Sequence, residues 1–420
     1  MKRIHLTITA QAPLAIGQRK PGGSVSEAMD YIPGTVIRGT IAGRILQQAN
    51  SDPGVDDDGN DDDFRKLFLG SNAAIFQNAY PAVTKLGEDQ YTINDSDVCL
   101  LPATALSSKT DSGFKPKKAG VFDSLIDSFC AREHGLFYEP NSLEGDRVEP
   151  FTGFYSQSEG RYISQSISKR LLTRVGINRR RTTAQDEILY SIEVMNESQG
   201  KEHPQPSVYK GSILIEDNVL SEALYQFIER NRDRLRFGGS ASRGLGKVET
   251  VAAIEDVETS VSPLQQRLKS FNQALKKRWG FWNAFGAPKP DRTQGRTFFA
   301  IDLQSDAVLT EQWRRTMVIS ANMLCQLTNM TGSDINLEMA YSSYDYRSGW
   351  NAAWGLPKDV ELITKMGSVF LFSVPETQAE QWQAKLAALE WRGVGDRTAE
   401  GFGQIKVCDE FHLIFRETPV

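Results

Sequence analysis

Alternating apolar and polar positions predict a first unit of strands and two helices. Lys2–Thr9 alternates in the way that is typical of a strand with one buried face. Helical spacing of apolar residues begins near Gly34 and returns at Ser221–Leu235. Strands are predicted at Ile188–Met195, at Ser212–Glu216 and after the second helix. The predicted order is therefore β-α-β-β-α-β.

The same order recurs nearer the end of the chain. Thr297–Leu303 predicts a strand, and a helix is expected from Thr310 to Leu327. Gly367–Ser373 predicts another strand, and Glu376–Glu390 predicts a second helix before a final loop and strand. A repeated order of elements indicates duplication. We predict an α+β fold of two tandem ferredoxin-like domains, each with two helices on one face of a sheet.

The length of 420 residues is too great for one ordinary core and is consistent with two domains. The first domain is expected at 1–255, with an acidic loop at 51–63, an insertion without clear period at 98–155 and a basic hairpin at 160–195. A helical linker is expected at 256–295, and the second domain at 296–420.

The composition is that of a globular protein, with 40% hydrophobic and 24% charged residues. No apolar run reaches the roughly 18 to 20 residues that a membrane span needs. The alternating N-terminus indicates a strand and not a signal peptide. Four cysteines lie far apart without a C-x-x-C pair, which fits a reducing cytoplasm better than a disulfide framework. We expect a cytoplasmic protein without membrane contact.

The distribution of charge changes the meaning of the net value of −5. Asp52–Asp63 holds seven aspartates and no base, and without it the chain would carry +2. Arg161–Arg181 holds seven bases and no acid. Because local field and not net charge attracts a polyanion, this second run is a candidate phosphate-binding segment. Arginine favours this interpretation, since its guanidinium matches phosphate oxygens bidentately.

Two glycine-rich loops follow the second helix of each unit. FGGSASRGLGKV begins at Phe237, and WRGVGDRTAEGFGQI begins at Trp391. Glycine permits positive φ and close backbone approach, and successive free N–H groups form a concavity suited to phosphate. Each loop carries embedded arginine, which we expect at the same place in the repeat. Neither loop matches a P-loop or a dinucleotide fingerprint, because G-K-[ST] is missing and each loop follows a helix.

These segments together resemble the RAMP superfamily of CRISPR proteins, whose domain is related to the RNA-recognition fold. YIPGTVIRGTIAGRIL (31–46) is similar to the family's opening, with Arg38 one turn into the helix. The two glycine loops are similar to the family's loops, and RVGINRRRTTAQDEILYSIE (174–193) resembles its basic hairpin, or thumb. LPATALSSK (101–109) and SGWNAAWGLPK (348–358) resemble the large type III-D RAMP subunit.

The resemblance implies an RNA-binding structural subunit of a type III CRISPR effector complex. Such a subunit holds the 5′ handle of the CRISPR RNA, as a Cas-five-like protein, and docks the large polymerase-like subunit in antiviral defence. Its partners would be CRISPR RNA, other RAMP subunits and, indirectly, target RNA, without a cofactor. The expected RNA-binding residues are Arg38, Lys169, Arg170, Arg174, Arg179, Arg180, Arg181, Gly238, Gly239, Arg243, Gly244, Gly246, Arg392, Gly393, Gly395, Arg397, Gly401 and Gly403. The aromatic RNP1 pattern is missing, so backbone capture is expected in place of base stacking on an open sheet.

Catalysis is an alternative that the sequence leaves open. Some backbone RAMP subunits cut target RNA with an aspartate in the loop after the first strand, and the matching loop offers Glu27 and Asp30. A guide-processing endoribonuclease would need a histidine paired with a nucleophile or acid, and His5, His203 and His412 show no such pairing in the sequence. A structural subunit that does not touch RNA is a further alternative. We expect binding without enzymatic activity.

A metal site in the insertion is the weakest candidate. Cys130 and His134 are four residues apart and can share a helix face. A structural zinc needs about four ligands, so this pair falls short. We expect no metal, with Cys130 buried and His134 at the surface.

Overall fold

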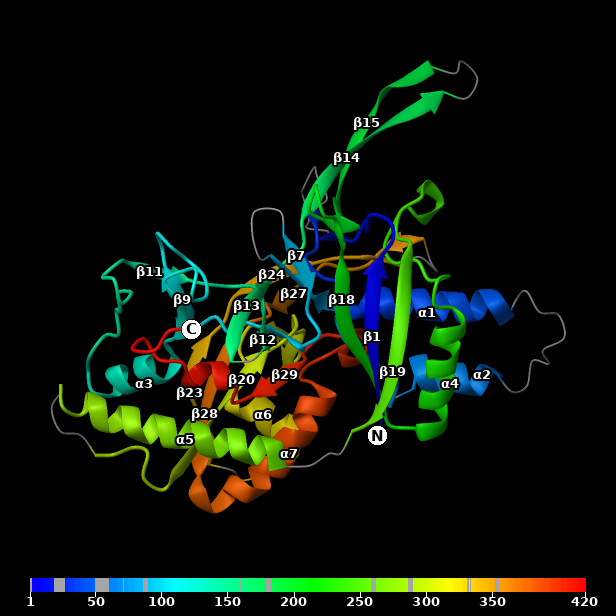
Figure 1. The fold of residues 1–420 in the computed structure, drawn as a ribbon. Coiled ribbons are helices and arrows are strands. Elements are labelled where there is room, and N and C mark those ends of the chain that lie inside the picture. Colours follow the sequence, from blue (N-terminus) through cyan, green and yellow to red (C-terminus); the bar gives the residue numbers. More distant parts are fainter. Residues whose placement is uncertain are drawn as a thin grey trace.

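The computed structural model describes residues 2–18, 27–49, 60–70, 72–85, 90–158, 160–178, 183–257, 262–285, 290–330, 332, 334–351 and 355–420. Two mixed α/β units lie side by side, and a long hairpin projects from between them (Figure 1). None of the helices in the described ranges has an apolar stretch of the length and hydropathy that a bilayer crossing requires.

The first unit has the predicted order β-α-β-β-α-β, but one predicted strand is wrong. Ile188–Met195 lies in the projecting hairpin and not in the sheet, and the strand after the first helix is instead formed by Ile75–Phe76 and Tyr80–Pro81. Its elements are β1 (Lys2–Ala10), α1 (Gly34–Ala49), β4 (Ile75–Phe76), β5 (Tyr80–Pro81), β18 (Val208–Ile215), α4 (Asn218–Arg230) and β19 (Val248–Asp256). The antiparallel sheet has the order β19-β1-β18-β4, with β5 also paired to β18. Ile4, Leu6 and Ile8 alternate along β1 and share one core with apolar residues of α1 and α4. Both helices therefore cover the same face of this sheet.

The second unit repeats the order and the strand pairing. Its elements are β20 (Arg296–Leu303), α6 (Ala321–Thr328), β23 (Asn336–Tyr341), β28 (Val369–Pro375), α7 (Ala379–Arg392) and β29 (Ile405–Val407). The sheet order is β29-β20-β28-β23, which corresponds strand by strand to the order β19-β1-β18-β4 of the first sheet. The expected helix from Thr310 is wrong at its start. A short hairpin, β21 (Leu309–Glu311) and β22 (Arg314–Thr316), comes first, and the helix begins after Ser320, whose side chain accepts from the Met323 N–H.

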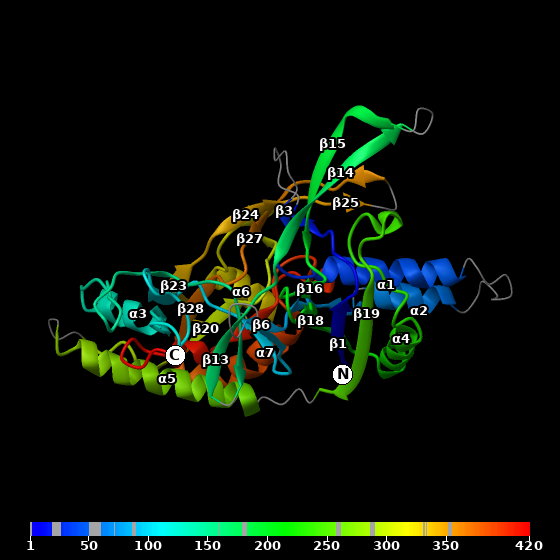
Figure 2. The same cartoon turned by 45° about the horizontal axis from the view of Figure 1, so that its top comes forward.

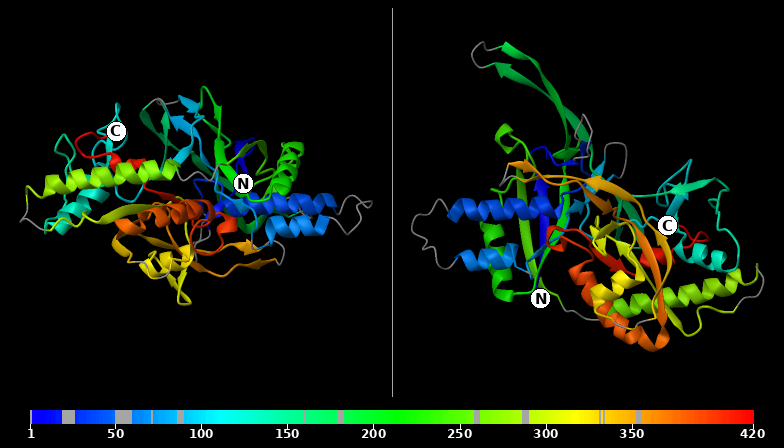
Figure 3. Two further views of the ribbon diagram at one scale, coloured as in Figure 1. Left: turned by 90° about the horizontal axis from the view of Figure 1, so that it is seen from below. Right: turned by 180° about the vertical axis from the view of Figure 1, so that it is seen from behind.

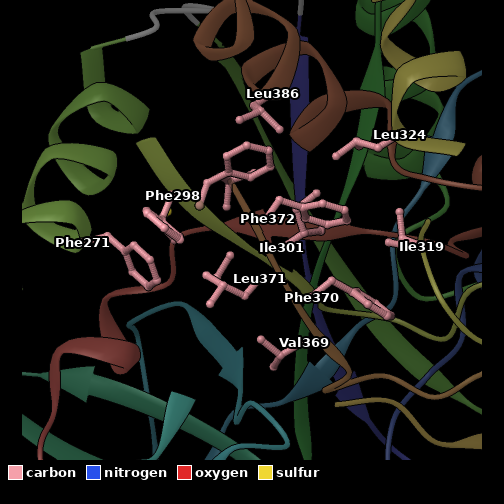
Figure 4. Close-up of a cluster of buried hydrophobic side chains, with 14 of the residues drawn as sticks. Phe271, Phe298, Ile301, Ile319, Leu324, Val369, Phe370, Leu371, Phe372 and Leu386 are labelled. Atoms are coloured by element: carbon pink, nitrogen blue, oxygen red, sulfur yellow. The ribbon is translucent and has the colours of Figure 1, made fainter. Parts of the chain in front are cut away.

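The second sheet is buried on both faces, unlike the first. Figure 4 shows Phe370 and Phe372 of β28 on the side of Leu324 and Leu386, with Leu371 on the other side near Phe298 and Phe271. Phe271 lies in α5 (Ser262–Trp282), the helix expected in the linker, which thus packs on the face opposite α6 and α7. Two covered faces explain why β20 and β28 read as nearly continuous apolar runs.

The insertion between β5 and β18 packs largely against the second unit. It contains β6 (Val83–Lys85), β7 (Tyr91–Ile93), β8 (Val98–Leu100), β9 (Ala105–Ser108), β10 (Val121–Asp123), α3 (Leu125–Glu133), β11 (Val148–Pro150), β12 (Phe154–Ser158), β13 (Arg161–Gln165), β14 (Lys169–Asn178), β15 (Thr183–Met195), β16 (Ser198–Gln199) and β17 (Gln205–Pro206). Leu125 and Phe129 of α3 join the core of the second sheet. Buried Asp127 accepts hydrogen bonds from Arg278 at 2.6 and 2.7 Å, which fixes α3 against α5.

Strands β14 and β15 form the projecting hairpin, which we call the thumb (Figure 1). Arg161 does not belong to it, because β13 pairs with β12 and β6. The expected acidic loop ends sooner than predicted, since α2 (Asn60–Phe68) begins within it. Residues 51–59 of that loop lie outside the described residues.

Candidate nucleic-acid interface

The two glycine loops have the same backbone path. Ser240 and Arg397 both adopt left-handed φ values, of 59° and 61°, before the short helices η1 (Ala241–Arg243) and η3 (Thr398–Glu400). Gly244 and Gly401 end those helices at φ 85° and 91°. The loops also bind the segment after each unit's first strand alike: the Gly239 N–H donates to the Ala15 carbonyl and the Asp396 N–H donates to the Val308 carbonyl, both at 2.8 Å.

Most of these glycines are required by the turn itself. A Cβ at Gly238 would lie 2.6 Å from the Ala15 carbonyl oxygen, and one at Gly395 would lie 2.4 Å from that of Val308. Gly246 and Gly403 close the loop in the same crowded way against the carbonyl oxygens of Phe237 and Val394. Backbone packing therefore accounts for these glycines without any ligand.

The arginines of the two loops are not at equivalent places, so that expectation is wrong. The shared hydrogen bonds and φ values place Arg243 opposite Glu400 and Arg397 opposite Ser240. Three glycines of each loop do repeat in register: Gly238, Gly244 and Gly246 correspond to Gly395, Gly401 and Gly403.

The first loop is exposed from Gly239 to Gly244, apart from the half-buried Ser240. A Cβ at Gly244 would meet no atom within 4 Å. The Arg243 guanidinium lies over the ring of Tyr190 in β15, 5.7 Å from its centroid, and donates to the Tyr190 hydroxyl. The exposed first loop thus joins the thumb through an arginine–aromatic pair.

The second loop is closed off by the first unit. A Cβ at Gly401 would lie 2.6 Å from the Phe76 carbonyl oxygen, and Gly401 and Gly403 are both buried. Arg397 donates to the carboxylates of Glu400 and Glu361. Burial alone would lower the pKa of Arg397, but its bonds and charge interactions with these two acids raise it. Its guanidinium is therefore already occupied.

The remaining predicted bases differ in their freedom. Arg392, which precedes Gly393, is 72% exposed, with its guanidinium 3.9 Å from the Glu216 carboxylate. Arg38 of α1 donates to the Phe68 carbonyl and ties α1 to α2. Arg170 is paired with Glu197 at 2.9 Å.

Arg174 lies opposite Tyr190 in the thumb, and within the described residues no acidic partner for it is found. Arg179, Arg180 and Arg181 lie outside the described residues.

The base of the thumb is fixed to the strap that follows β1, which includes β2 (Gly17–Gln18) and β3 (Glu27–Ala28). Lys169 donates to the Ala28 carbonyl at 2.7 Å, and its ammonium lies 2.6 Å from the Asp30 carboxylate. The Ala28 N–H donates to the Glu193 carboxylate at 2.6 Å. These contacts orient the thumb and leave Lys169 neutralised.

A cavity of about 520 Å³ lies between the two units beside the first loop. It is lined by Thr35 and Gly39 of α1, by Gly238 and Gly239, and by the arm that connects β23 to β28 in the second unit. That arm consists of β24 (Tyr344–Arg347), β25 (Trp350–Asn351), β26 (Leu356–Pro357) and β27 (Glu361–Thr364). It extends toward the thumb and runs beside α1 in Figure 2 and in the right panel of Figure 3. The arm and the thumb occupy the same β-β connection of their units.

Arg347 is the site residue that sequence reasoning missed. It lines the cavity, lies 5.2 Å from the Phe402 ring centroid, and donates to buried Asp306 at 3.2 Å. Burial would lower the pKa of Arg347, but the nearby Tyr31 and Asp306 raise it. Arg347 directly precedes SGWNAAWGLPK (348–358). The alternating sequence YDYR (344–347) indicates a strand there and could have pointed to this residue.

Comparison with known families assigns residues 7–249, more than half of the chain, to the RAMP superfamily model. The chain belongs to the RAMP superfamily. Among solved structures, this RAMP chain is similar at 13% identity and a TM-score of 0.39 to a chain of the type III-B Cmr-beta complex bound to cognate target RNA and AMPPnP, with 90% of this chain and 88% of that chain covered. A chain of the Cmr-beta complex bound to cognate target RNA has 14% identity and a TM-score of 0.38, with the same two coverages. A chain of the apo state of Cmr-beta has 12% identity and a TM-score of 0.29, with 60% of this chain and 97% of that chain covered. No curated protein matched the RAMP chain.

The catalytic candidates of the RAMP chain lie at the thumb base. The Asp30 side chain is 65% exposed and paired with Lys169, while Glu27 is exposed in β3 opposite Gln18. The Lys169–Asp30 pair and the contacts of Ala28 with Lys169 and Glu193 place both near the start of the thumb.

The metal candidates of the RAMP chain lie in the core and not at the surface. His134 is buried, which corrects the expectation of exposure, and its Nδ1 lies 2.7 Å from the Cys130 carbonyl oxygen. Its ring packs on Trp279 at a centroid distance of 4.7 Å. Burial raises the pKa of the Cys130 thiol, which disfavours the thiolate that zinc requires. Among the described residues, no group of three or more potential ligands surrounds the pair.

Proposed function

We propose that this RAMP protein is a non-enzymatic RNA-binding subunit of a type III CRISPR effector complex. In this proposal its two β-α-β-β-α-β units are the two ferredoxin-like domains of a type III-D, Cas-five-like subunit. It holds the 5′ handle of the CRISPR RNA and docks the large polymerase-like subunit and other RAMP subunits in the cytoplasm. Target RNA is contacted only through the complex.

The observation that carries the proposal is the contact between the exposed first glycine loop and the thumb. Arg243 over Tyr190 joins this loop to a long basic hairpin. The cavity beside this loop has a volume of about 520 Å³, which is large enough to accept a splayed base. Gly238 and Gly239 line its wall. Backbone capture with bases held in pockets is a common mode for single-stranded RNA.

The test removes charge from the thumb in the full-length protein. Replacing Arg179, Arg180 and Arg181 by alanine should weaken binding of a labelled handle RNA. The slope of log affinity against log salt should fall by about 2, since each phosphate contact of a single strand contributes about 0.7. The matched control replaces exposed Lys269, Lys276 and Lys277 of α5, which removes the same charge elsewhere. Equal losses in both variants would contradict thumb binding.

Catalysis is tested in the assembled complex. Labelled target RNA is incubated with complexes that contain the natural chain or Asp30→Ala. The proposal expects identical cleavage patterns, because Asp30 serves to hold Lys169 at the thumb base. Loss of one cut with normal RNA loading would show that this chain is a nuclease.

A further inference from the structure

The tip of the β21–β22 hairpin holds a tryptophan that packing does not explain. Trp313 is 100% exposed, the largest exposed fraction among the apolar side chains in the described ranges. Gln312 and Trp313 form the two-residue turn, because Glu311 and Arg314 are paired across it. Burial is the usual reason for a tryptophan in a hairpin, and here it is absent.

The turn also places Trp313 in an unfavourable backbone conformation. Gln312 and Trp313 have φ values of 48° and 65°. A two-residue turn with both φ values positive favours Asn-Gly, since only small residues tolerate this region well. A bulky residue at the glycine position therefore works against hairpin stability. Strain of this kind, together with full exposure, indicates a side chain retained for contact with another molecule.

The hairpin is anchored to the second glycine loop, which fixes where Trp313 is presented. Arg315 and Thr310 donate to the Asp396 carboxylate at 2.6 and 2.7 Å, and Arg315 also donates to Glu361 of the arm. Glu361 lines the cavity beside the first loop. The hairpin lies between the first strand and first helix of its unit, as the β2–β3 strap does in the first unit.

The neighbours of Trp313 favour a nucleic acid over a protein partner. Arg314 is exposed, and no acidic partner for it is found in the part of the chain that the structure describes. The flanking Gln312 and Arg315 side chains are also exposed and polar, so polar and basic groups border the ring along the hairpin. An aromatic ring beside free arginine is the arrangement that stacks on an unpaired base and holds its phosphate.

We infer that the β21–β22 turn is a second single-stranded RNA contact, in which a base stacks on Trp313 and its phosphate pairs with Arg314. The contact rests on the proposed RNA binding but uses a different unit from the thumb. The shared chemistry is an unpaired nucleotide, supplied by guide or by target RNA.

The first experiment measures affinity of the purified full-length protein for a fluorescein-labelled 12-nucleotide uridine RNA. Trp313→Ala and Trp313→Gly should weaken binding about tenfold, and Trp313→Phe should keep most of the affinity, because it keeps a stacking ring. Phe137→Ala, at another exposed aromatic (91%), is the control and should bind normally. Trp313→Gly should melt no lower than the natural protein, which separates RNA contact from folding.

The outcomes distinguish this contact from the thumb. Full binding by Trp313→Gly, alongside loss in the thumb variant, overturns this inference and leaves the proposed function standing. Failure of the natural protein to bind overturns both. In the assembled complex, 4-thiouridine in the guide or in the target should crosslink to the turn and identify the source. Normal RNA binding by Trp313→Gly with loss of a neighbouring subunit would instead assign the turn to a protein partner and overturn the RNA contact.

Discussion

The two glycine loops have one backbone and two environments. Phe237–Val248 and Val394–Ile405 share their hydrogen bonds and their left-handed positions. The first loop faces solvent beside the thumb, whereas the second is sealed against Phe76 and its arginine is held by two glutamates. The glycine pattern therefore specifies a turn, and the packing of the two units decides whether that turn is exposed.

The largest expected effect comes from adding one methyl group at the same place in each loop. Gly401→Ala must fit a Cβ 2.6 Å from the Phe76 carbonyl oxygen at φ 91°, so we expect a loss of about 2 to 4 kcal/mol of unfolding free energy. Gly244→Ala meets open space and should lose about 1 kcal/mol from backbone strain alone. Urea unfolding of both variants measures the difference. Equal losses would show that the second loop is not confined.

Removing the arginine of each loop should separate stability from binding. Arg397→Ala removes the closest partner of two half-buried glutamates, leaving Glu361 with Arg315 and Glu400 with Lys358, and should lower the unfolding free energy by about 1 to 3 kcal/mol. Arg243→Ala is at an exposed position and should change it by less than about 0.5 kcal/mol. RNA affinity should show the opposite order, with the loss in Arg243→Ala. A larger binding loss in Arg397→Ala, at equal stability, would reverse the roles of the loops.

The smallest effect concerns pH and the second loop. Burial would raise the pKa of Glu400, but the hydrogen bond and charge of Arg397 lower it in the folded protein. The resulting stability is present above the pKa of an unfolded glutamate, about 4.3, and is lost as pH falls through the folded value. Glu400→Gln should therefore lose less stability than the natural protein in urea unfolding between pH 5 and pH 3. Exposed Glu410→Gln is the control and should follow the natural protein.

The local pattern predicted the elements better than their surroundings. Alternation in β1 and helical spacing in α4 gave the right types, because each reflects one buried face. Thr310–Leu327 was predicted as helix throughout because its apolar spacing continues across the β21–β22 turn. The sequence Gln312-Trp313 does not predict the positive φ values of that turn, because a hairpin turn of this kind normally contains Asn-Gly.

The candidate site was predicted less well, for a physical reason. Contacts such as Gly401 against Phe76, or Arg347 with Asp306 and Phe402, join residues far apart in the chain. Exposure of a loop depends on such contacts and not on its own residues. The composition located the basic hairpin and both loops, but it did not show which arginines are already paired.

The packing of α3 has a consequence for biosynthesis. Phe129 is covered by Trp279 and Phe298, which are translated about 150 residues later. A nascent chain that has completed its first sheet therefore still lacks the residues of α5 and β20 that cover Phe129. Until α5 and β20 leave the ribosome, α3 cannot reach its final packing, so the insertion of the first unit is completed only together with the second unit.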